Sequence, residues 1–147
     1  MKLAIVGSRN VTDYNLIKSN VDELRKVSLI GGFRGVVPCG KEDVTEIISG
    51  GARGVDSLAA RYAGEHDLKL TVYPADWDKY DSNGVRYTDR GAGYARNHII
   101  AKNCDVMIAF WDGTSVGTKH SIKIAKMDYN KPVHIVLIKE DSSGKTN

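Results

Sequence analysis

Three short segments rich in glycine, serine and threonine carry the residues best suited to binding an anion. They are "GSRN" (7–10), "SGGARG" (49–54) and "WDGTSVGT" (111–118). Small residues let a ligand approach the backbone closely, and N–H groups at the start of a helix favour negative charge. Hydroxyl and guanidinium groups in or near these segments add donors that suit phosphate or carboxylate. These donors are Ser8, Arg9, Ser49, Arg53, Arg96, Thr114, Ser115 and Thr118.

The spacing of the glycines in "SGGARG" excludes two familiar phosphate-binding motifs. The segment lacks the G-x-G-x-x-G pattern of dinucleotide-binding proteins and the Lys-Ser/Thr pair of a P-loop. Taken alone, it is equally typical of a tight turn between a strand and a helix. A ligand site is favoured only if the three segments converge in space.

Acidic and aromatic residues near the same segments extend the candidate site. Asp76 and Asp112 are candidate catalytic acids, and Asp56 either accepts a ribose hydroxyl or complements the dipole of the helix that it begins. Trp77 and Trp111 either stack against a nucleobase or cap the end of the sheet. The histidines share no pattern, and neither cysteine lies in a metal-binding motif. We therefore expect no metal.

Short apolar runs alternate with segments of helical periodicity along the whole chain. The predicted strands span 2–6, 44–49, 69–75, 105–110 and 132–138, and the predicted helices span about 12–26, 54–65, 93–103 and 118–129. This alternation predicts an α/β fold: a single Rossmann-like, three-layer domain with a five-stranded, mainly parallel sheet and helices on both faces. Parallel strands end at a shared edge, so the three small-residue segments are expected to converge on one crevice.

The domain is expected to span 1–140, with a polar tail over 141–147 and two insertions. The first insertion, 28–43, is rich in glycine and predicts a long loop or an interface element. The second, 81–91, belongs to a polar loop over 76–92. It is expected to be either a lid over the crevice or a surface insertion without ligand contact.

Composition narrows the class of protein. The 147 residues are 41% hydrophobic and 27% charged, as in one ordinary globular domain. A net charge of +3 permits a phosphate-bearing partner but does not demand nucleic acid. Cys39 and Cys104 lie far apart and fit reduced thiols, while the run "VMIAFW" is too short to cross a bilayer. We therefore expect a cytoplasmic protein without a membrane partner.

Five motifs in order resemble the YspA-like group of the SLOG superfamily. They are "GSRN", "SGGARGVDSLAARYA", "YPADWDKY", "AGYARN" and "DVMIAFWDGTSVGTKHSI". The resemblance covers nearly the whole chain and implies a Rossmann-like protein that binds a nucleotide or a nucleotide-derived ligand. Because the superfamily is often dimeric, it also implies a homo-oligomer.

Within the superfamily, the LOG phosphoribohydrolases cleave the base from a nucleoside monophosphate. Arg96 matches the arginine of their motif, and Gly113, Gly117 and Thr118 match parts of their PGGxGTxxE loop. Ser121 stands where their catalytic glutamate would be. A hydroxyl cannot stabilise an oxocarbenium ion or activate water as a carboxylate does, so hydrolysis here would need an acid from another loop.

The DNA-processing protein A family, which binds single-stranded DNA, is also similar. Its glycine motif resembles "SGGARGVDSLA", and its Asp-x-x-Tyr-Pro-x-x-Asn motif loosely resembles "DKYDSN". The chain is only mildly basic and has no basic run interleaved with aromatic residues. Single-stranded DNA is therefore the less favoured partner.

The sequence thus predicts binding of a nucleotide or nucleotide-derived small molecule, in a sensor or sequestering role, at the carboxyl-terminal edge of the sheet. No cofactor is expected to be required. The alternatives are an N-glycosidic bond hydrolase or transferase acting on a nucleotide, and single-stranded DNA binding, so enzymatic activity stays open. The candidate ligand-binding residues are Gly7, Ser8, Arg9, Ser49, Gly50, Gly51, Arg53, Gly54, Asp56, Trp77, Arg96, Asn97, Trp111, Asp112, Gly113, Thr114, Ser115, Gly117 and Thr118.

Overall fold

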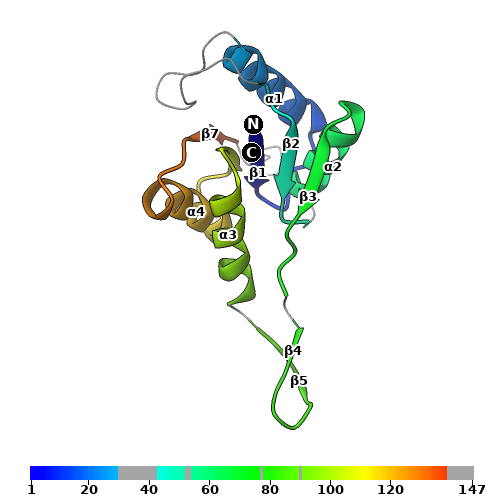
Figure 1. Ribbon diagram of the computed structural model, residues 1–147, viewed down its shortest axis with the longest axis vertical. Coiled ribbons are helices and arrows are strands. Elements are labelled where there is room, and N and C mark those ends of the chain that lie inside the picture. The colour runs from blue at the N-terminus through cyan, green and yellow to red at the C-terminus, as the bar shows by residue number, and fades with distance from the viewer. Residues whose placement is uncertain (30–42, 52–53, 77, 90, 139–147) are drawn as a thin grey trace, which may run out of the picture.

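The computed structural model describes residues 1–29, 43–51, 54–76, 78–89 and 91–138. Most of the 28–43 insertion, the 141–147 tail, Arg53 and Trp77 therefore lie outside the described residues. Five strands form one parallel sheet in the order β3–β2–β1–β6–β7 (Figure 1). They are β1 (Lys2–Gly7), β2 (Glu46–Ser49), β3 (Lys69–Val72), β6 (Val106–Trp111) and β7 (Val133–Leu137). The predicted α/β fold is confirmed.

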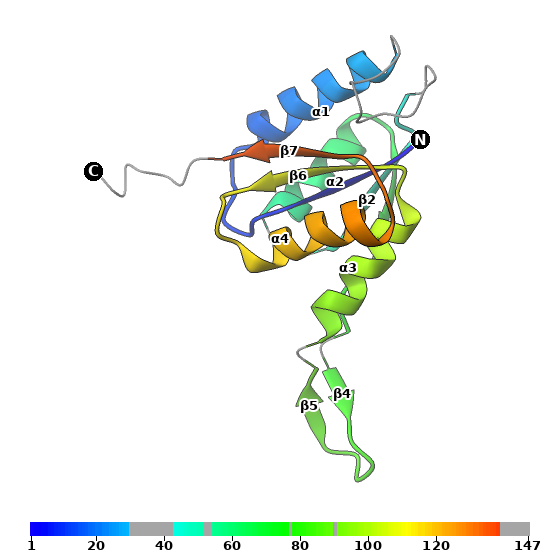
Figure 2. The ribbon, with the colours of Figure 1, turned by 90° about the vertical axis from the view of Figure 1, so that its left-hand side faces the viewer.

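Helices cover both faces of the sheet, so the domain has three layers (Figure 2). Alternate residues of β1 show the division, because Leu3 and Ile5 pack with α1 and α2 whereas Ala4 and Val6 pack with α3 and α4. All four of these side chains are buried, as expected for the central strand of a parallel sheet. The helices are α1 (Tyr14–Leu29), α2 (Val55–Glu65), α3 (Ala92–Asn103) and α4 (Val116–Lys123).

The last predicted helix differs from the expected one in two ways. It begins at Val116 rather than at 118, and it ends as a π-helical turn, η1 (Ile124–Asp128). In this turn the Tyr129 N–H donates to the Ile124 carbonyl, five residues earlier, at 3.2 Å. The earlier start matters for the site, because it brings the first N–H groups of α4 to the end of β6.

The amino-terminal edge of the sheet is held by a network of paired charges. Arg25 of α1 donates to both carboxylate oxygens of Asp43 at 3.0 Å and to the hydroxyl of the fully buried Tyr62 at 3.1 Å. The Tyr62 hydroxyl in turn donates to Asp22 at 2.6 Å. Burial, followed by the hydrogen bond to Asp22, raises the pKa of Tyr62 to about 12. These bonds join α1 and α2 to the segment that enters β2.

Residues 76–92 do not form the predicted loop. They contain an antiparallel hairpin of β4 (Asp78–Tyr80) and β5 (Arg86–Thr88), which projects away from the body of the domain (Figures 1 and 2). Its turn is closed by Asp81, whose carboxylate accepts hydrogen bonds from the Asn83 and Val85 N–H groups at 2.9 Å. The hairpin thus extends from the body of the domain and does not cover the carboxyl-terminal edge of the sheet as a lid would.

Two further expectations concern membrane-spanning helices and metal ligands. In the part of the chain that the structure describes, no helix is long and apolar enough to cross a membrane. Within the same ranges, no group of three or more histidine, cysteine, aspartate or glutamate side chains is placed to hold a metal ion. Cys104 is a buried free thiol, and its burial raises its pKa to about 11.

Candidate functional site

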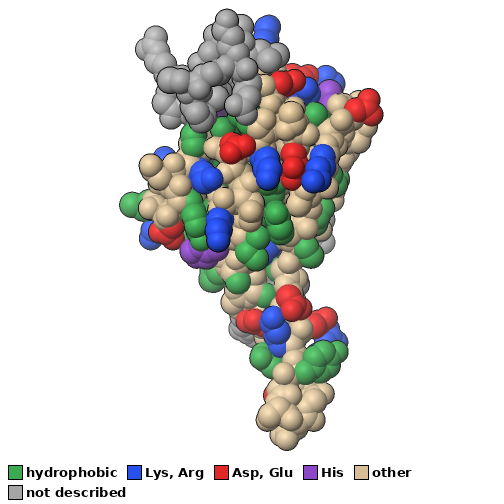
Figure 3. Space-filling model, viewed as in Figure 1, with side chains coloured by type: hydrophobic (Ala, Val, Ile, Leu, Met, Phe, Trp, Pro, Cys, Tyr) green, Lys and Arg blue, Asp and Glu red, His purple; other side chains and the backbone are tan. Residues whose placement is uncertain are grey.

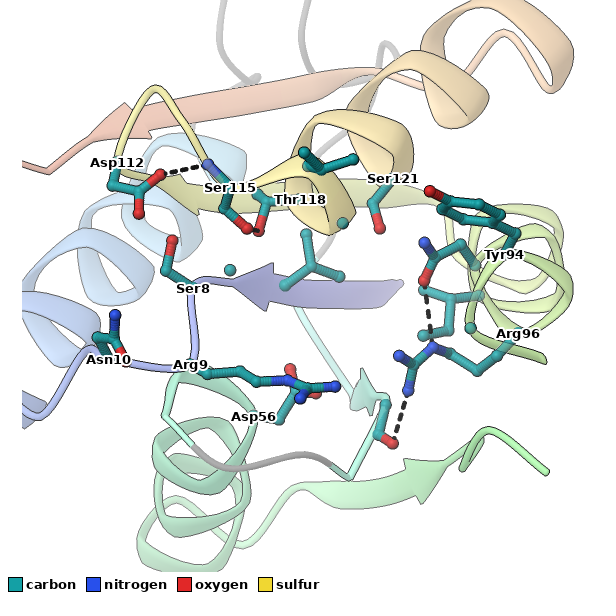
Figure 4. A pocket seen from close by; sticks show the side chains of 18 residues that line it. Ser8, Arg9, Asn10, Asp56, Tyr94, Arg96, Asp112, Ser115, Thr118 and Ser121 are labelled. Atoms are coloured by element: carbon teal, nitrogen blue, oxygen red, sulfur yellow. Dashed lines mark hydrogen bonds between the residues drawn. The ribbon is translucent and has the colours of Figure 1, made fainter. Parts of the chain in front are cut away.

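A pocket of about 570 Å³ opens at the carboxyl ends of β1 and β6 (Figure 4). The strand order reverses between these two strands, because the chain builds the sheet outward from β1 through β2 and β3, and then from β6 to β7. In open α/β sheets this switch point is where ligands bind. The lining residues are Val6, Gly7, Ser8, Arg9, Asn10, Gly50, Asp56, Gly93, Tyr94, Arg96, Asn97, Ile100, Asp112, Ser115, Val116, Gly117, Thr118 and Ser121.

The structure brings together candidates from all three small-residue segments. The predicted residues that line the pocket are Gly7, Ser8, Arg9, Gly50, Asp56, Arg96, Asn97, Asp112, Ser115, Gly117 and Thr118. Predicted residues that belong to the same segments but do not line it are Ser49, Gly51, Gly54, Trp111, Gly113 and Thr114. Asp76 does not line it either, and its carboxylate accepts a hydrogen bond from Lys79 at 3.0 Å. Arg53 and Trp77 lie outside the described residues.

Several lining residues were not predicted from the sequence. They are Val6, Asn10, Gly93, Tyr94, Ile100, Val116 and Ser121. A helical-face argument finds some of them, because Tyr94, Asn97 and Ile100 recur on one side of α3, and Ser121 lies one turn after Gly117 on α4. In the sequence, Ser121 stands out only as the counterpart of the catalytic glutamate of the LOG motif.

The glycines of "SGGARG" are covered by the protein itself. A side chain at Gly50 would meet the Arg96 guanidinium and the Asp56 carboxylate. Gly54 has φ of +74°, and a side chain there would collide with the backbone of Arg9. These glycines therefore mostly make room for other parts of the protein rather than for a ligand. Of the three, Gly50 lines the pocket, whereas Gly51 and Gly54 do not.

The "WDGTSVGT" segment leaves more room. Asp112 closes its turn, since its carboxylate accepts hydrogen bonds from the Thr114 N–H at 2.9 Å and the Ser115 N–H at 2.7 Å. These two bonds lower the pKa of Asp112 and occupy two N–H groups that were expected to bind phosphate. The next N–H groups begin α4 and have no acceptor within the helix. At Gly117 no atom lies within 4 Å of the position of a side-chain carbon.

Two arginines face the pocket from different elements (Figure 4). Arg96 of α3 is fixed, because its Nη1 donates to the Gly50 carbonyl at 2.9 Å and its Nε donates to Asn97 Oδ1 at 3.1 Å. Burial lowers the pKa of Arg96, the Asp56 carboxylate raises it, and the positive charge of Arg9 lowers it again. The electrostatic repulsion between the two arginines would be relieved by an anion bound between them.

Ser8 presents an unsatisfied donor at the end of β1. Its side chain is buried, and its Oγ makes no hydrogen bond of ordinary geometry to the residues that the structure describes, although it lies close enough to the Asp112 carboxylate to help lower the pKa of that group. Its backbone is fully used, because its N–H donates to the Phe110 carbonyl at 3.2 Å and its carbonyl accepts from the Val55 N–H at 3.3 Å. A buried hydroxyl without a partner costs about 1–3 kcal/mol, which a ligand acceptor in the pocket would recover.

The model of a protein family, the YspA, cpYpsA-related SLOG family, matches residues 1–80. This chain belongs to that SLOG family. The matched region holds β1 to β4 and two of the three small-residue segments of the pocket. The resemblance to the YspA-like group of the SLOG superfamily, expected from the sequence, is thereby confirmed.

Three individual proteins are similar to this SLOG chain, one in sequence and two in fold. The gene 61 protein of Mycobacterium phage D29 is 35% identical over 86 residues, which cover 54% of this chain and 62% of the phage protein. DNA processing protein A of Helicobacter pylori has a similar fold, with a TM-score of 0.57, 23% identity, and coverage of 98% of this chain and 70% of that one. The Streptococcus pneumoniae protein gives a TM-score of 0.57, 18% identity, and coverage of 99% and 62%.

Proposed function

We propose that this SLOG protein binds a nucleotide or a nucleotide-derived small molecule in the pocket between β1 and β6. The phosphate would lie at the first turn of α4, against Gly117 and Thr118, with Arg9 and Arg96 across the pocket. The role that fits this arrangement is that of a sensor or a sequestering protein for the ligand. Membership of the SLOG family agrees with this proposal.

The observation that carries the proposal is the open start of α4 beside the two arginines. Free N–H groups at a helix start and two facing guanidinium groups both favour a bound anion. Gly117 is a lining glycine at which a ligand has space, whereas Gly7 and Gly50 are covered by protein atoms. A volume of about 570 Å³ lies within the range of small-molecule sites, roughly 300–1,000 Å³.

Single-stranded DNA is the competing ligand. The Helicobacter pylori DNA processing protein A is described by its single-stranded DNA binding mode, but at 23% identity its likeness to this chain is a likeness of fold. The pocket contains two acidic residues, Asp56 and Asp112, which oppose a polyanion. On the face seen in Figure 3, basic and acidic side chains alternate and form no continuous basic track. A small ligand is therefore favoured.

We expect binding without cleavage of the N-glycosidic bond. Asp112 is held by two N–H groups that favour its ionised form, so it carries no proton for a leaving base at neutral pH. Asp76 does not line the pocket, and Ser121 lies in the pocket with a hydroxyl in place of a carboxylate. Asp56 is then the remaining acid of the pocket that a hydrolytic mechanism would need.

Calorimetric titration with AMP, ATP, NAD and cyclic AMP at low salt tests the proposal. We expect one site per chain and a loss of affinity of at least tenfold in Gly117→Glu, because a carboxylate would occupy the anion position. Gly64→Glu is the matched control, since Gly64 is an exposed position of α2 with open space around it. No binding by the wild type, or equal binding by Gly117→Glu, would overturn the proposal.

Two further measurements separate the alternatives. Chromatography of nucleotides incubated with the protein detects free base, and its release would favour the hydrolase. Binding of an oligo(dT) strand that weakens steeply with salt would favour single-stranded DNA.

The hairpin is our candidate surface for the expected homo-oligomer, because Tyr80, Val85 and Tyr87 are exposed on it. Sedimentation of Tyr80→Ser beside the wild type tests this, since a homo-oligomer held by the hairpin would dissociate.

A further inference from the structure

The end of the pocket farthest from Asp112 and Ser8 is formed by an aromatic residue, Tyr94 (Figure 4). Tyr94 belongs to the first turn of α3, and its side chain is 48% exposed although it lines a pocket. A ring with so much free surface beside an anion site is a surface on which a planar group can stack. The question is whether the ring is held in place or only lies at the rim.

The Tyr94 ring packs on the imidazole of His120, which belongs to α4. The two ring centroids are 4.2 Å apart and the ring planes are tilted by 47°. His120 is itself held, because its Nδ1 lies 3.1 Å from the amide nitrogen of Asn97. Asn97 is buried and lines the pocket between Tyr94 and Arg96.

Arg96 fixes the direction of the hydrogen bonds that link it to Asn97 and Asn97 to His120, because an arginine side chain can only donate. Arg96 Nε donates to an Asn97 side-chain atom at 3.1 Å, so that atom must be the oxygen. The Asn97 amide nitrogen then faces His120 as a donor, and Nδ1 of His120 must be the acceptor. His120 is therefore neutral in this arrangement and carries its proton on Nε2.

A single chain of contacts thus runs along the α3 side of the pocket (Figure 4). It runs from the Gly50 carbonyl through Arg96, Asn97 and His120 to the Tyr94 ring. Arg96 and Tyr94 both lie on this side, across the pocket from Ser8 and Asp112 (Figure 4), so one network orients the cationic group and the aromatic group. A nucleotide offers a partner for each, with a phosphate for the cation and a planar base for the ring.

We propose that Tyr94 is the platform on which the nucleobase of the ligand stacks, with His120 and Asn97 as the positioning residues that hold its ring. This inference rests on the proposed nucleotide-binding function and adds the part of the ligand that determines specificity. Stacking tolerates any nucleobase, because every base has a flat face. A purine is nevertheless expected to bind more tightly than a pyrimidine, because its ring system is larger.

The test compares AMP with ribose 5-phosphate, which has the phosphate and sugar but no base. In the wild type we expect AMP to bind more tightly than ribose 5-phosphate, by the factor that stacking supplies. Stacking of a base on an aromatic ring is worth about 1–3 kcal/mol, so Tyr94→Leu should weaken AMP by roughly 5-fold to 150-fold. The same variant should leave ribose 5-phosphate unchanged, and Tyr94→Phe should bind AMP as the wild type does.

The control is Tyr87→Leu, an exposed tyrosine of the hairpin that lies outside the pocket lining. It should change neither affinity. If the wild type binds both ligands equally, the stacking platform is refuted while the nucleotide phosphate site stands. If the wild type binds neither, the proposed function and this inference both fail. Equal losses for both ligands in Tyr94→Leu would mean that the tyrosine only supports the fold.

The positioning role of His120 has its own readout in the ratio of the two affinities. Burial, together with the charge of His98, lowers the pKa of His120, while Asp128 of η1 raises it and Lys123 of α4 lowers it. Protonated Nδ1 would face the Asn97 amide as a second donor, and the contact would break. The ratio of the AMP affinity to the ribose 5-phosphate affinity should therefore fall in the wild type as the pH is lowered from 7.5 through the pKa of His120, which lies below 6.5. It should stay constant in His120→Gln, and a parallel fall in both proteins would refute the role.

Discussion

The segments "SGGARG" and "WDGTSVGT" are both rich in small residues, but their glycines have different roles in the structure. In the first, Gly50 and Gly54 are glycines because Arg96, Asp56 and the Arg9 backbone lie where side chains would be. In the second, Gly117 has open space beside it and lines the pocket. A glycine can thus make room for the protein or for a ligand.

The same contrast applies to the N–H groups of the second segment. Thr114 and Ser115 donate to Asp112, so these N–H groups hold the turn in shape. The N–H groups one residue further on belong to the first turn of α4 and have no helical acceptor. The boundary between structural and available donors therefore falls at Val116, within a segment that reads as one motif.

The largest expected effect separates the two kinds of glycine by stability. Gly54→Ala combines a left-handed φ of +74° with a collision against backbone, which cannot move away. We expect a loss of about 2–5 kcal/mol in the free energy of unfolding. Gly117→Ala should instead gain a few tenths of a kcal/mol, as should Gly64→Ala in α2, because alanine favours a helix. Urea denaturation of the three variants measures this, and equal losses in Gly54→Ala and Gly117→Ala would break the contrast.

Gly50→Ala tests an intermediate case, where the covering atoms are the ends of side chains. The added methyl group would displace the Arg96 guanidinium and the Asp56 carboxylate, which can shift. We expect a loss of only about 1 kcal/mol in stability, but roughly a tenfold loss in nucleotide affinity, because Arg96 would leave the Gly50 carbonyl. Unchanged affinity in a titration with AMP would show that the position of Arg96 is not important for binding.

Much of this arrangement can be predicted from the sequence, because its signals are local. The run "KLAIV" followed by Gly7 and Ser8, and "VMIAFW" followed by Asp112, give buried strands that end in small or polar residues. With the parallel topology, these ends meet at one edge. The pocket therefore lies where the sequence places it.

What could not be predicted depends on contacts between distant segments. The sequence around Gly50 and Gly54 does not predict that Arg96 and the backbone of Arg9 cover these glycines, because both arginines come from other segments. Tyr94 shares a helical face with Asn97, but whether that face lines the pocket depends on how α3 is oriented against α4. The hairpin was missed because β4 and β5 have three residues each and both lie largely exposed, so neither shows a hydrophobic alternation.

Ser8→Ala examines the third segment, "GSRN", with opposite effects on stability and binding. Removing a buried hydroxyl that has no partner among the described residues should raise the free energy of unfolding by up to about 1 kcal/mol. The same change should weaken AMP about threefold to tenfold, since the ligand would lose a hydrogen bond. Thermal denaturation with and without AMP reads both effects. A destabilised variant would mean that the hydroxyl already has a partner in the folded protein.

The smallest effect concerns Asp112, which holds the turn but places a negative charge at the edge of an anion site. Its pKa lies below the usual 3.8, so its ionised form stabilises the fold above pH 3.8, and this contribution is lost as pH falls through the folded-state pKa. Asp112→Asn keeps an oxygen that accepts from Thr114 and Ser115, and should cost less than about 1 kcal/mol at pH 7.

The difference between wild type and Asp112→Asn should shrink as the pH is lowered below 3.8 and through the folded-state pKa, which urea denaturation at several pH values measures. Removing the charge should also tighten AMP about twofold to fivefold if the phosphate lies at the first turn of α4, because the nearest repulsive charge is gone. Weaker binding by Asp112→Asn would instead place the carboxylate in contact with the ligand, as an acceptor for a sugar hydroxyl. That result would move the phosphate away from α4 and towards Arg96, and so reverse the roles of the two segments.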